Sequence, residues 1–226
     1  MKKNPLTLAT LVFLSALFWP LSIAWAETKW SIELMAGEAF NLPMPLTVKQ
    51  SGQPDLNFIA NYDTGAFGEI YPAHEPYYSW RVGLWDGDQA WEFQHIHTKL
   101  YLLNPLAEIQ AFSITHGFNY FLINHAWKNP DFIYRVGAGV VVTHPENTVR
   151  GFILSAETGG LLNEGYYLSG VGIQAGIEKK IPIWRIFFLT LEGALTAALT
   201  QVPVVNGTAD VPNIALHIHI GPGLDF

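Results

Sequence analysis

The final residues of the chain, 213–226, alternate between apolar and polar or small side chains. One parity holds Ile214, Leu216, Ile218, Ile220, Leu224 and Phe226, and the other holds Ala215, His217, His219, Gly221, Gly223 and Asp225. A period of two places successive side chains on opposite faces of a β-strand. We therefore predict that the chain ends in a strand with one apolar face and one polar or small face.

Seven further segments are patterned as strands and lie at residues 30–42, 77–85, 91–102, 108–124, 132–143, 167–179 and 183–200. Within them, residues 181–199 are the one stretch that could be taken for a transmembrane helix. A helix would place Arg185 and Glu192 inside a bilayer, which costs a few kcal/mol for each charge. A strand instead turns Glu192 away from the apolar face, so the pattern favours a strand here as well.

The connections between these eight strands alternate in character. Residues 86–89, 127–131 and 179–182 are short and carry Gly, Pro, Asn or Asp, which predicts tight turns. Residues 43–76, 104–107, 144–166 and 201–212 join the opposite ends, and three of these four connections are long. Segment 56–67 stays ambiguous, because it could belong to a ten-stranded arrangement or could fold over or into the mouth of an eight-stranded one.

Residues 1–26 have the features of a secretory signal peptide. Lys2 and Lys3 precede an apolar segment at 6–19, and Ala24 and Ala26 supply small residues before the cleavage position. The apolar segment is shorter than the ~20 residues that a spanning helix needs. The chain contains no cysteine, so the exported protein must be stable without disulfides.

Together, the signal peptide, the alternating strands and the closing strand that ends at Phe226 resemble those of small bacterial outer-membrane β-barrel proteins. The resemblance implies an all-β, eight-stranded antiparallel up-and-down transmembrane β-barrel over residues 27–226, with periplasmic termini and long outer loops. It also implies that the insertion machinery reads the C-terminal strand. The composition agrees, because half of the residues are apolar and only 14% are charged, against about 25% in soluble domains.

The charge of the chain bears on its partners. The formal net charge is −7, and the loss of Lys2 and Lys3 with the signal peptide makes it −9. Nucleic acid is therefore excluded as a partner, since phosphate binding requires a basic surface. Side chains nearly fill the interior of an eight-stranded barrel, so we expect a closed lumen. The resemblance also implies a monomer in contact with outer-membrane lipid and lipopolysaccharide.

Histidines are the main candidates for chemistry. His217 and His219 share the inward parity of the last strand and are weak candidates for a metal site, because zinc sites use three or four N, O or S ligands. Glu192 should lie close to His219 across the last hairpin, which allows an acid–base pair. The competing interpretation, which the composition of small lumens favours, is a structural network in which Glu192 pairs with Arg81 or Arg135.

A second group of histidines lies on the hairpin formed by residues 91–124. His95 and His97 share parity with the apolar Trp91 and Phe93, so either they point outward or a bulge reverses the face. His116 shares parity with apolar residues too, an unusual position for a histidine in contact with lipid. We name His97, His116 and Glu192 as candidate catalytic residues and expect no cofactor.

Two functions remain open. The first is a structural or binding barrel whose outer loops contact envelope lipid or external ligands. The second is an outer-leaflet enzyme that modifies lipid A or phospholipid with barrel-wall His and Glu residues. The His-x-Ser-Asn motif of lipid A 3-O-deacylases is absent, because the histidines of the central strands are followed at the second position by His97, Lys99, Phe118 and Trp127. Whether the chain is an enzyme is left undecided by the sequence.

Overall fold

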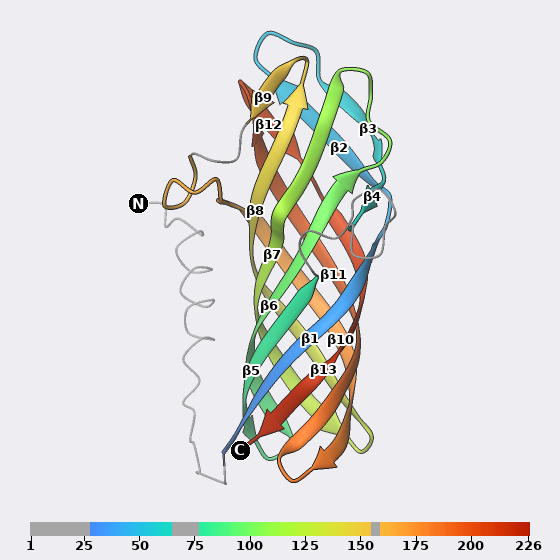
Figure 1. The fold of residues 1–226 in the computed structure, drawn as a ribbon, viewed down its shortest axis with the longest axis vertical. Coiled ribbons are helices and arrows are strands. Elements are labelled where there is room, and N and C mark those ends of the chain that lie inside the picture. The colour runs from blue at the N-terminus through green and yellow to red at the C-terminus, as the bar shows by residue number, and fades with distance from the viewer. Residues whose placement is uncertain (1–27, 65–76, 155–158) are drawn as a thin grey trace, which may run out of the picture.

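Eight long antiparallel strands close into a ring in the computed structural model, which describes residues 28–64, 77–154 and 159–226 (Figure 1). The ring order is β1, β5, β6, β7, β8, β10, β11 and β13, and β13 returns to β1. These strands are β1 (Lys29–Asn41), β5 (Tyr78–Asp86), β6 (Gln89–Leu102), β7 (Ile109–Asn129), β8 (Phe132–Val149), β10 (Tyr167–Trp184), β11 (Phe187–Val204) and β13 (Asn213–Asp225). The predicted signal peptide at 1–26 lies outside the described residues.

The two ends of the ring differ as the connection lengths predicted. Three short turns lie at the end that also holds the C-terminus, the lower end in Figure 1, and they link β5 to β6, β7 to β8 and β10 to β11. The first and last ring strands meet there, because the Trp30 amide donates to the Phe226 carbonyl at 2.7 Å. The four longer connections lie at the upper end.

Two of the predicted short turns are shifted by the observed pairing. The strand ladder continues through residues 179–182, where Lys180 faces Thr190 and Pro182 faces Phe188, so the turn lies at Arg185 and Ile186. Similarly, β7 extends to Asn129, and the turn after it shortens to residues 130–131. Continued backbone pairing satisfies more amide and carbonyl groups than an early turn would.

Three of the predicted outer loops contain strands in their described residues. The additional strands are β2 (Met44–Gln50), β3 (Leu56–Ala60), β4 (Tyr62–Asp63), β9 (Phe152–Leu154) and β12 (Gly207–Asp210), which bring the described total to thirteen. β12 pairs with both β11 and β2, and β2 pairs with β3, so the wall continues above the ring. The ambiguous segment 56–67 supplies β3 and β4 outside the ring, and its residues 65–67 lie outside the described part of the chain.

The upper interior is a continuous apolar core. Its fully buried members include Leu46, Val48, Leu100, Ile114 and Phe118. The apolar set at 112–122 on β7 points into this core, and the polar Ser113 and Thr115 lie on the opposite, outward side.

Lower in the ring the alternation separates a polar interior from an apolar exterior. On β11, Leu191, Leu195 and Leu199 are exposed on the outward face, whereas Glu192 and Thr196 are buried inside. The other ring strands add exposed residues to the same outward surface, among them Ile32, Leu34, Phe93, Ile123, Val136, Val140, Val171, Ile173, Ile177, Leu216, Ile218 and Ile220. No helix in the described part of the chain is long and apolar enough to span a membrane.

Small residues on β10 make room for large inward side chains from the nearby strands β8 and β7. A Cβ at Gly172 would lie 2.8 Å from the ring of Tyr120, and a Cβ at Gly176 would lie 3.2 Å from the Arg135 side chain. Glycine therefore permits the close approach of these two groups.

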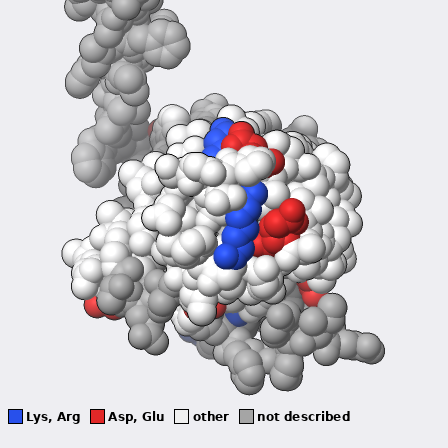
Figure 2. All heavy atoms as spheres, turned by 90° about the horizontal axis from the view of Figure 1, so that it is seen from above, with Lys and Arg blue, Asp and Glu red and all other residues white. Residues whose placement is uncertain are grey.

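Among the described residues of the upper end, Figure 2 shows positive and negative groups side by side on a mostly uncharged surface. Lys49 on β2 donates to Asp210 on β12 at 2.8 Å, and this hydrogen bond lowers the pKa of the Asp210 carboxyl. The guanidinium of Arg150 reaches the side-chain oxygen of Gln50 and the carbonyl of Pro54.

Ring closure can be tested by cross-linking, because the chain has no native cysteine. Ala36 and Ile220 face each other across β1 and β13. Directly opposed Cα atoms lie about 4.5–5.5 Å apart, within the range for a disulfide. We expect Ala36→Cys/Ile220→Cys to oxidise to a disulfide with altered mobility in non-reducing electrophoresis.

The matched control is Ala36→Cys/Leu195→Cys, in which β13 separates the two positions. We expect no intramolecular disulfide in it. Equal cross-linking in both pairs, or none in the first, would contradict the closure of the ring through β1 and β13.

Candidate functional site

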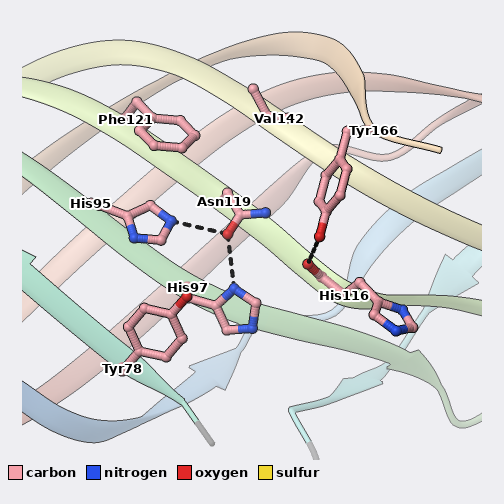
Figure 3. Close-up of a pocket in the computed structure, with 8 residues that line it drawn as sticks. All are labelled: Tyr78, His95, His97, His116, Asn119, Phe121, Val142 and Tyr166. Atoms are coloured by element: carbon pink, nitrogen blue, oxygen red, sulfur yellow. Dashed lines mark hydrogen bonds between the residues drawn. The ribbon is translucent and has the colours of Figure 1, made fainter. Parts of the chain in front are cut away.

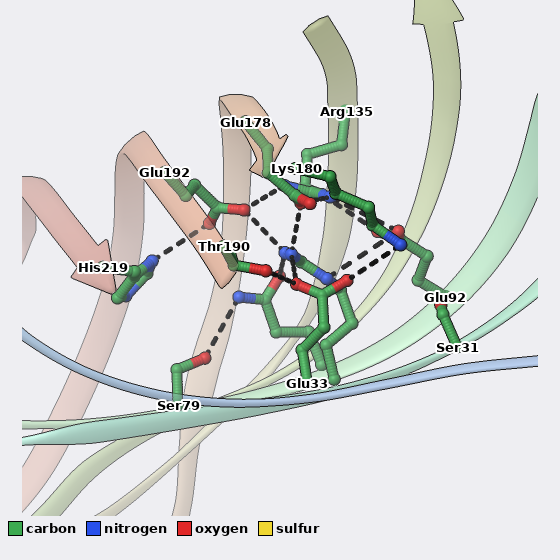
Figure 4. A network of polar contacts seen from close by, with 12 residues as sticks. Ser31, Glu33, Ser79, Glu92, Arg135, Glu178, Lys180, Thr190, Glu192 and His219 are labelled. Carbon is green, nitrogen blue, oxygen red and sulfur yellow. Dashed lines mark hydrogen bonds and ion pairs between the residues drawn. The ribbon is translucent and has the colours of Figure 1, made fainter. Parts of the chain in front are cut away.

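Two arginines occupy the lower interior of the ring and contact four carboxylates (Figure 4). Arg81 donates through Nη1 to Glu192 at 2.7 Å and through Nη2 to Glu33 at 2.5 Å and Glu178 at 2.6 Å. Arg135 donates through Nε to Glu92 at 2.9 Å and also contacts Glu178 and Glu192. All six side chains are fully or almost fully buried.

The network extends to every strand of the ring. β1, β5, β6, β8, β10 and β11 each supply one of the six charged residues. β13 supplies His219, whose Nδ1 lies 3.0 Å from Glu192 Oε1. β7 supplies Asn124, which donates to Gln94, and Gln174 donates to both of these amides. The predicted proximity of Glu192 to His219 and to the inward arginines is confirmed.

Tyr77 bridges the two inward histidines of the last strand. Its hydroxyl lies 2.7 Å from His217 Nδ1 and 2.6 Å from His219 Nε2. The remaining nitrogens contact Thr196 Oγ1 at 2.8 Å and Glu192 Oε1 at 3.0 Å. Hydrogen bonds from side chains therefore satisfy all four imidazole nitrogens, which accounts for the burial of both histidines without a metal ion.

His95 and His97 point outward, which resolves the alternative that the sequence left open. Both belong to the parity of exposed Trp91 and Phe93, while Glu92 and Gln94 point inward. They lie in a pocket of about 410 Å³ on the outward wall (Figure 3). Its lining consists of Tyr78, His95, His97, His116, Asn119, Phe121, Val142 and Tyr166.

Asn119 orients the two imidazoles in this pocket. Its Oδ1 lies 3.0 Å from His95 Nε2 and 2.8 Å from His97 Nδ1 (Figure 3). An amide oxygen only accepts, so both ring nitrogens donate to it and the tautomers are opposite. His95 Nδ1, which is buried, has no hydrogen-bond partner. Phe121 stacks on His95, and Tyr78 stacks on His97, each with ring centroids 4.7 Å apart.

A β-bulge explains the position of His116. The register between β7 and β8 shifts between Ile114 and Phe118, where β7 carries extra residues. Gly117 adopts a φ of 123°, a conformation that other residues rarely adopt. The bulge turns His116 outward although Ile114 and Phe118 both point inward. His116 therefore lies at the edge of the outward pocket.

The structure does not bring the three candidate catalytic residues together. Glu192 lies inside the ring, whereas His97 and His116 lie on its outward face. Sequence reasoning missed Tyr77, which is the bridging group inside. It did not name the pocket residues Tyr78, Asn119 and Tyr166, although Asn119 lies on the hairpin of residues 91–124 that it singled out.

No family model matches the chain, and no curated protein matches its sequence. Among solved structures, it is similar to the outer membrane protein AlkL, studied by solid-state NMR in DMPC lipid bilayers, with 9% identity and a TM-score of 0.46 over 91% of this chain and 93% of that one. It is also similar to OprG from Pseudomonas aeruginosa, with 10% identity and a TM-score of 0.42 over 88% and 95%. Ail of Yersinia pestis has 9% identity and a TM-score of 0.37 over 88% and 97%.

The buried network predicts a strong effect of removing one arginine. Arg81→Met leaves carboxylates buried without their counter-charge, so we expect the free energy of unfolding to fall by about 3–5 kcal/mol. Urea unfolding in lipid vesicles, followed by tryptophan fluorescence, measures this change. Lys49→Met, which removes an exposed ion pair, is the control and should shift the midpoint little. Equal shifts in the two variants would contradict a stabilising role for the network.

Proposed function

We propose that the chain is an integral outer-membrane protein whose eight-stranded ring is a transmembrane β-barrel. The support is the inversion of polarity in the lower ring, where charged side chains are inside and aliphatic side chains are outside. Such inversion is stable in lipid, since a closed ring leaves no unpaired strand edge in the bilayer. Residues 1–26 then serve as the export signal, and residues 27–226 form the barrel domain.

Exposed aromatic residues support the orientation. Several lie at or near the lower end beside the short turns or the termini, namely Trp30, Trp91, Trp127, Phe132, Trp184, Phe187 and Phe226. Aromatic belts of this kind lie at membrane interfaces. With short turns on the periplasmic side, both termini are periplasmic, and β13 presents Phe226 to the insertion machinery. The proposed protein is a monomer surrounded by lipid and lipopolysaccharide.

The filled interior favours binding over conduction. Arg81, Arg135 and their four carboxylates occupy the lower lumen, and an apolar core occupies the upper interior. The proposed protein therefore does not conduct ions through its axis, in agreement with the small interior of eight-stranded barrels.

The outward pocket carries the proposed activity, which is the binding of an amphiphilic envelope lipid. His95 and His97 lie eight and ten residues above Gly87 in the β5–β6 turn, roughly 20–25 Å higher for tilted strands. This height is near the upper edge of a ~25 Å apolar band. Polar side chains on a lipid-facing wall are costly unless a partner satisfies them. A lipid with its polar group on the imidazoles and its chains along Phe121 and Val142 fits this arrangement.

An outer-leaflet enzyme remains the second candidate, and one observation favours it. Asn119 fixes the tautomers of both imidazoles, which is how an orienting group prepares a histidine to act as a base. The reacting set would then be His95 and His97 on the outward wall, without Glu192.

Lipid retention tests the proposal. Each of His97→Ala and Asn119→Ala removes a polar partner worth about 1–2 kcal/mol, so we expect roughly tenfold weaker retention of envelope lipid. Native mass spectrometry of protein purified in mild detergent measures the bound lipid. His125→Ala is the matched control, because His125 also lies on the outward side of β7 but outside the pocket.

Unchanged retention in both pocket variants would overturn the binding proposal. The envelope lipid profile separates the two candidates. A binding protein leaves the chemical structures of the lipids equal in wild-type and deletion strains. A modified lipid that disappears both on deletion and in folded His97→Ala would favour the enzyme.

A further inference from the structure

We propose that His116, His144 and Glu146 form a binding site for a divalent transition metal ion on the outward wall. One potential ligand atom from each residue lies within 4.8 Å of those of the other two. His116 Nδ1 is 3.6 Å from Glu146 Oε1, and the two imidazole centroids are 4.5 Å apart. This inference goes beyond lipid binding and does not depend on it.

The local backbone builds this cluster. His144 and Glu146 are two residues apart on β8, so both side chains point to the same outward face. The bulge at residues 114–118 of β7 turns His116 toward that face. Without the extra residues, an inward His116 would enter the apolar core beside Ile114 and Phe118. The bulge thus places a third potential ligand next to the other two.

An unsatisfied buried atom supports a ligand at this position. His144 is only 7% exposed, and its Nδ1 has no hydrogen-bond partner. Buried polar side-chain atoms nearly always have one, so an orphaned imidazole nitrogen requires an explanation. Tyr166 packs against the His144 ring with centroids 4.7 Å apart, which limits the positions that the imidazole can take. A metal ion would accept the lone pair of this nitrogen.

The donor set indicates the class of ion. Two imidazoles and one carboxylate suit Zn²⁺ and related first-row ions, whereas Ca²⁺ and Mg²⁺ prefer oxygen ligands alone. Tetrahedral zinc with Zn–N distances of about 2.0–2.1 Å needs ligand atoms roughly 3.3 Å apart. The 3.6 Å separation of His116 and Glu146 is close to this value. Three protein ligands leave a coordination position open.

Direct titration tests the site. The full-length mature protein, untagged and washed with chelator, is titrated in detergent micelles at neutral pH with Zn²⁺ by calorimetry. Co²⁺ absorption reports nitrogen and oxygen coordination in parallel. We expect one ion per chain. His144→Ala and Glu146→Gln should each weaken Zn²⁺ affinity at least roughly tenfold.

His125→Ala is the control and should bind Zn²⁺ as the wild type does. Heat-modifiable electrophoretic mobility confirms that each variant is folded, and Glu146→Gln keeps the shape of a half-exposed side chain. Folded wild type that binds no Zn²⁺ would overturn the proposal. Unchanged affinity in both His144→Ala and Glu146→Gln would also overturn it, because the ion would then lie elsewhere. Lipid retention is a separate measurement, so either proposal can fail alone.

Discussion

The pairing of two buried arginines with four buried carboxylates is the constraint on which the lower ring depends. Each charge would be costly alone in a closed interior, so the fold is stable only when all of them meet. Because Arg81 and Arg135 contact carboxylates from β1, β6, β10 and β11, the requirement fixes the relative positions of strands distant in sequence. The same charged side chains fill the lower interior of the ring.

The alternation of apolar and polar side chains predicted most of the strands that the charged network joins. It identified segments that overlap all eight ring strands and placed Glu192 beside His219, because a strand has a fixed period of two. It could not show which face of β7 is inside, since the upper interior is an apolar core and the outward wall beside it carries polar side chains, the reverse of the lower ring. The bulge at His116 was also beyond reach, because it depends on the pairing with β8. The strands in the longer upper connections were not predicted either. They depend on pairing between segments distant in sequence, as β2 pairs with β12.

Histidines lie both inside the ring and on its outward wall, and the two groups differ in how fully their nitrogens are hydrogen-bonded. Inside the ring, Tyr77, Thr196 and Glu192 satisfy both nitrogens of His217 and His219, and the histidines need nothing further. On the outward wall, nitrogens of His95 and His144 remain without hydrogen-bond partners. The outside of the ring is therefore the favoured place for chemistry, on the hairpin that carries His97 and His116, two of the three candidate residues named from the sequence.

The assignment of inside and outside can be measured directly by NMR in lipid nanodiscs. Nuclear Overhauser effects between acyl-chain protons and protein side chains report which residues face lipid. We expect contacts from Leu195, Ile173 and Phe121, and none from Thr196, His217 or Tyr120. Acyl-chain contacts to the second group, with none to the first, would contradict the placement of the charged network inside and the histidine pocket outside.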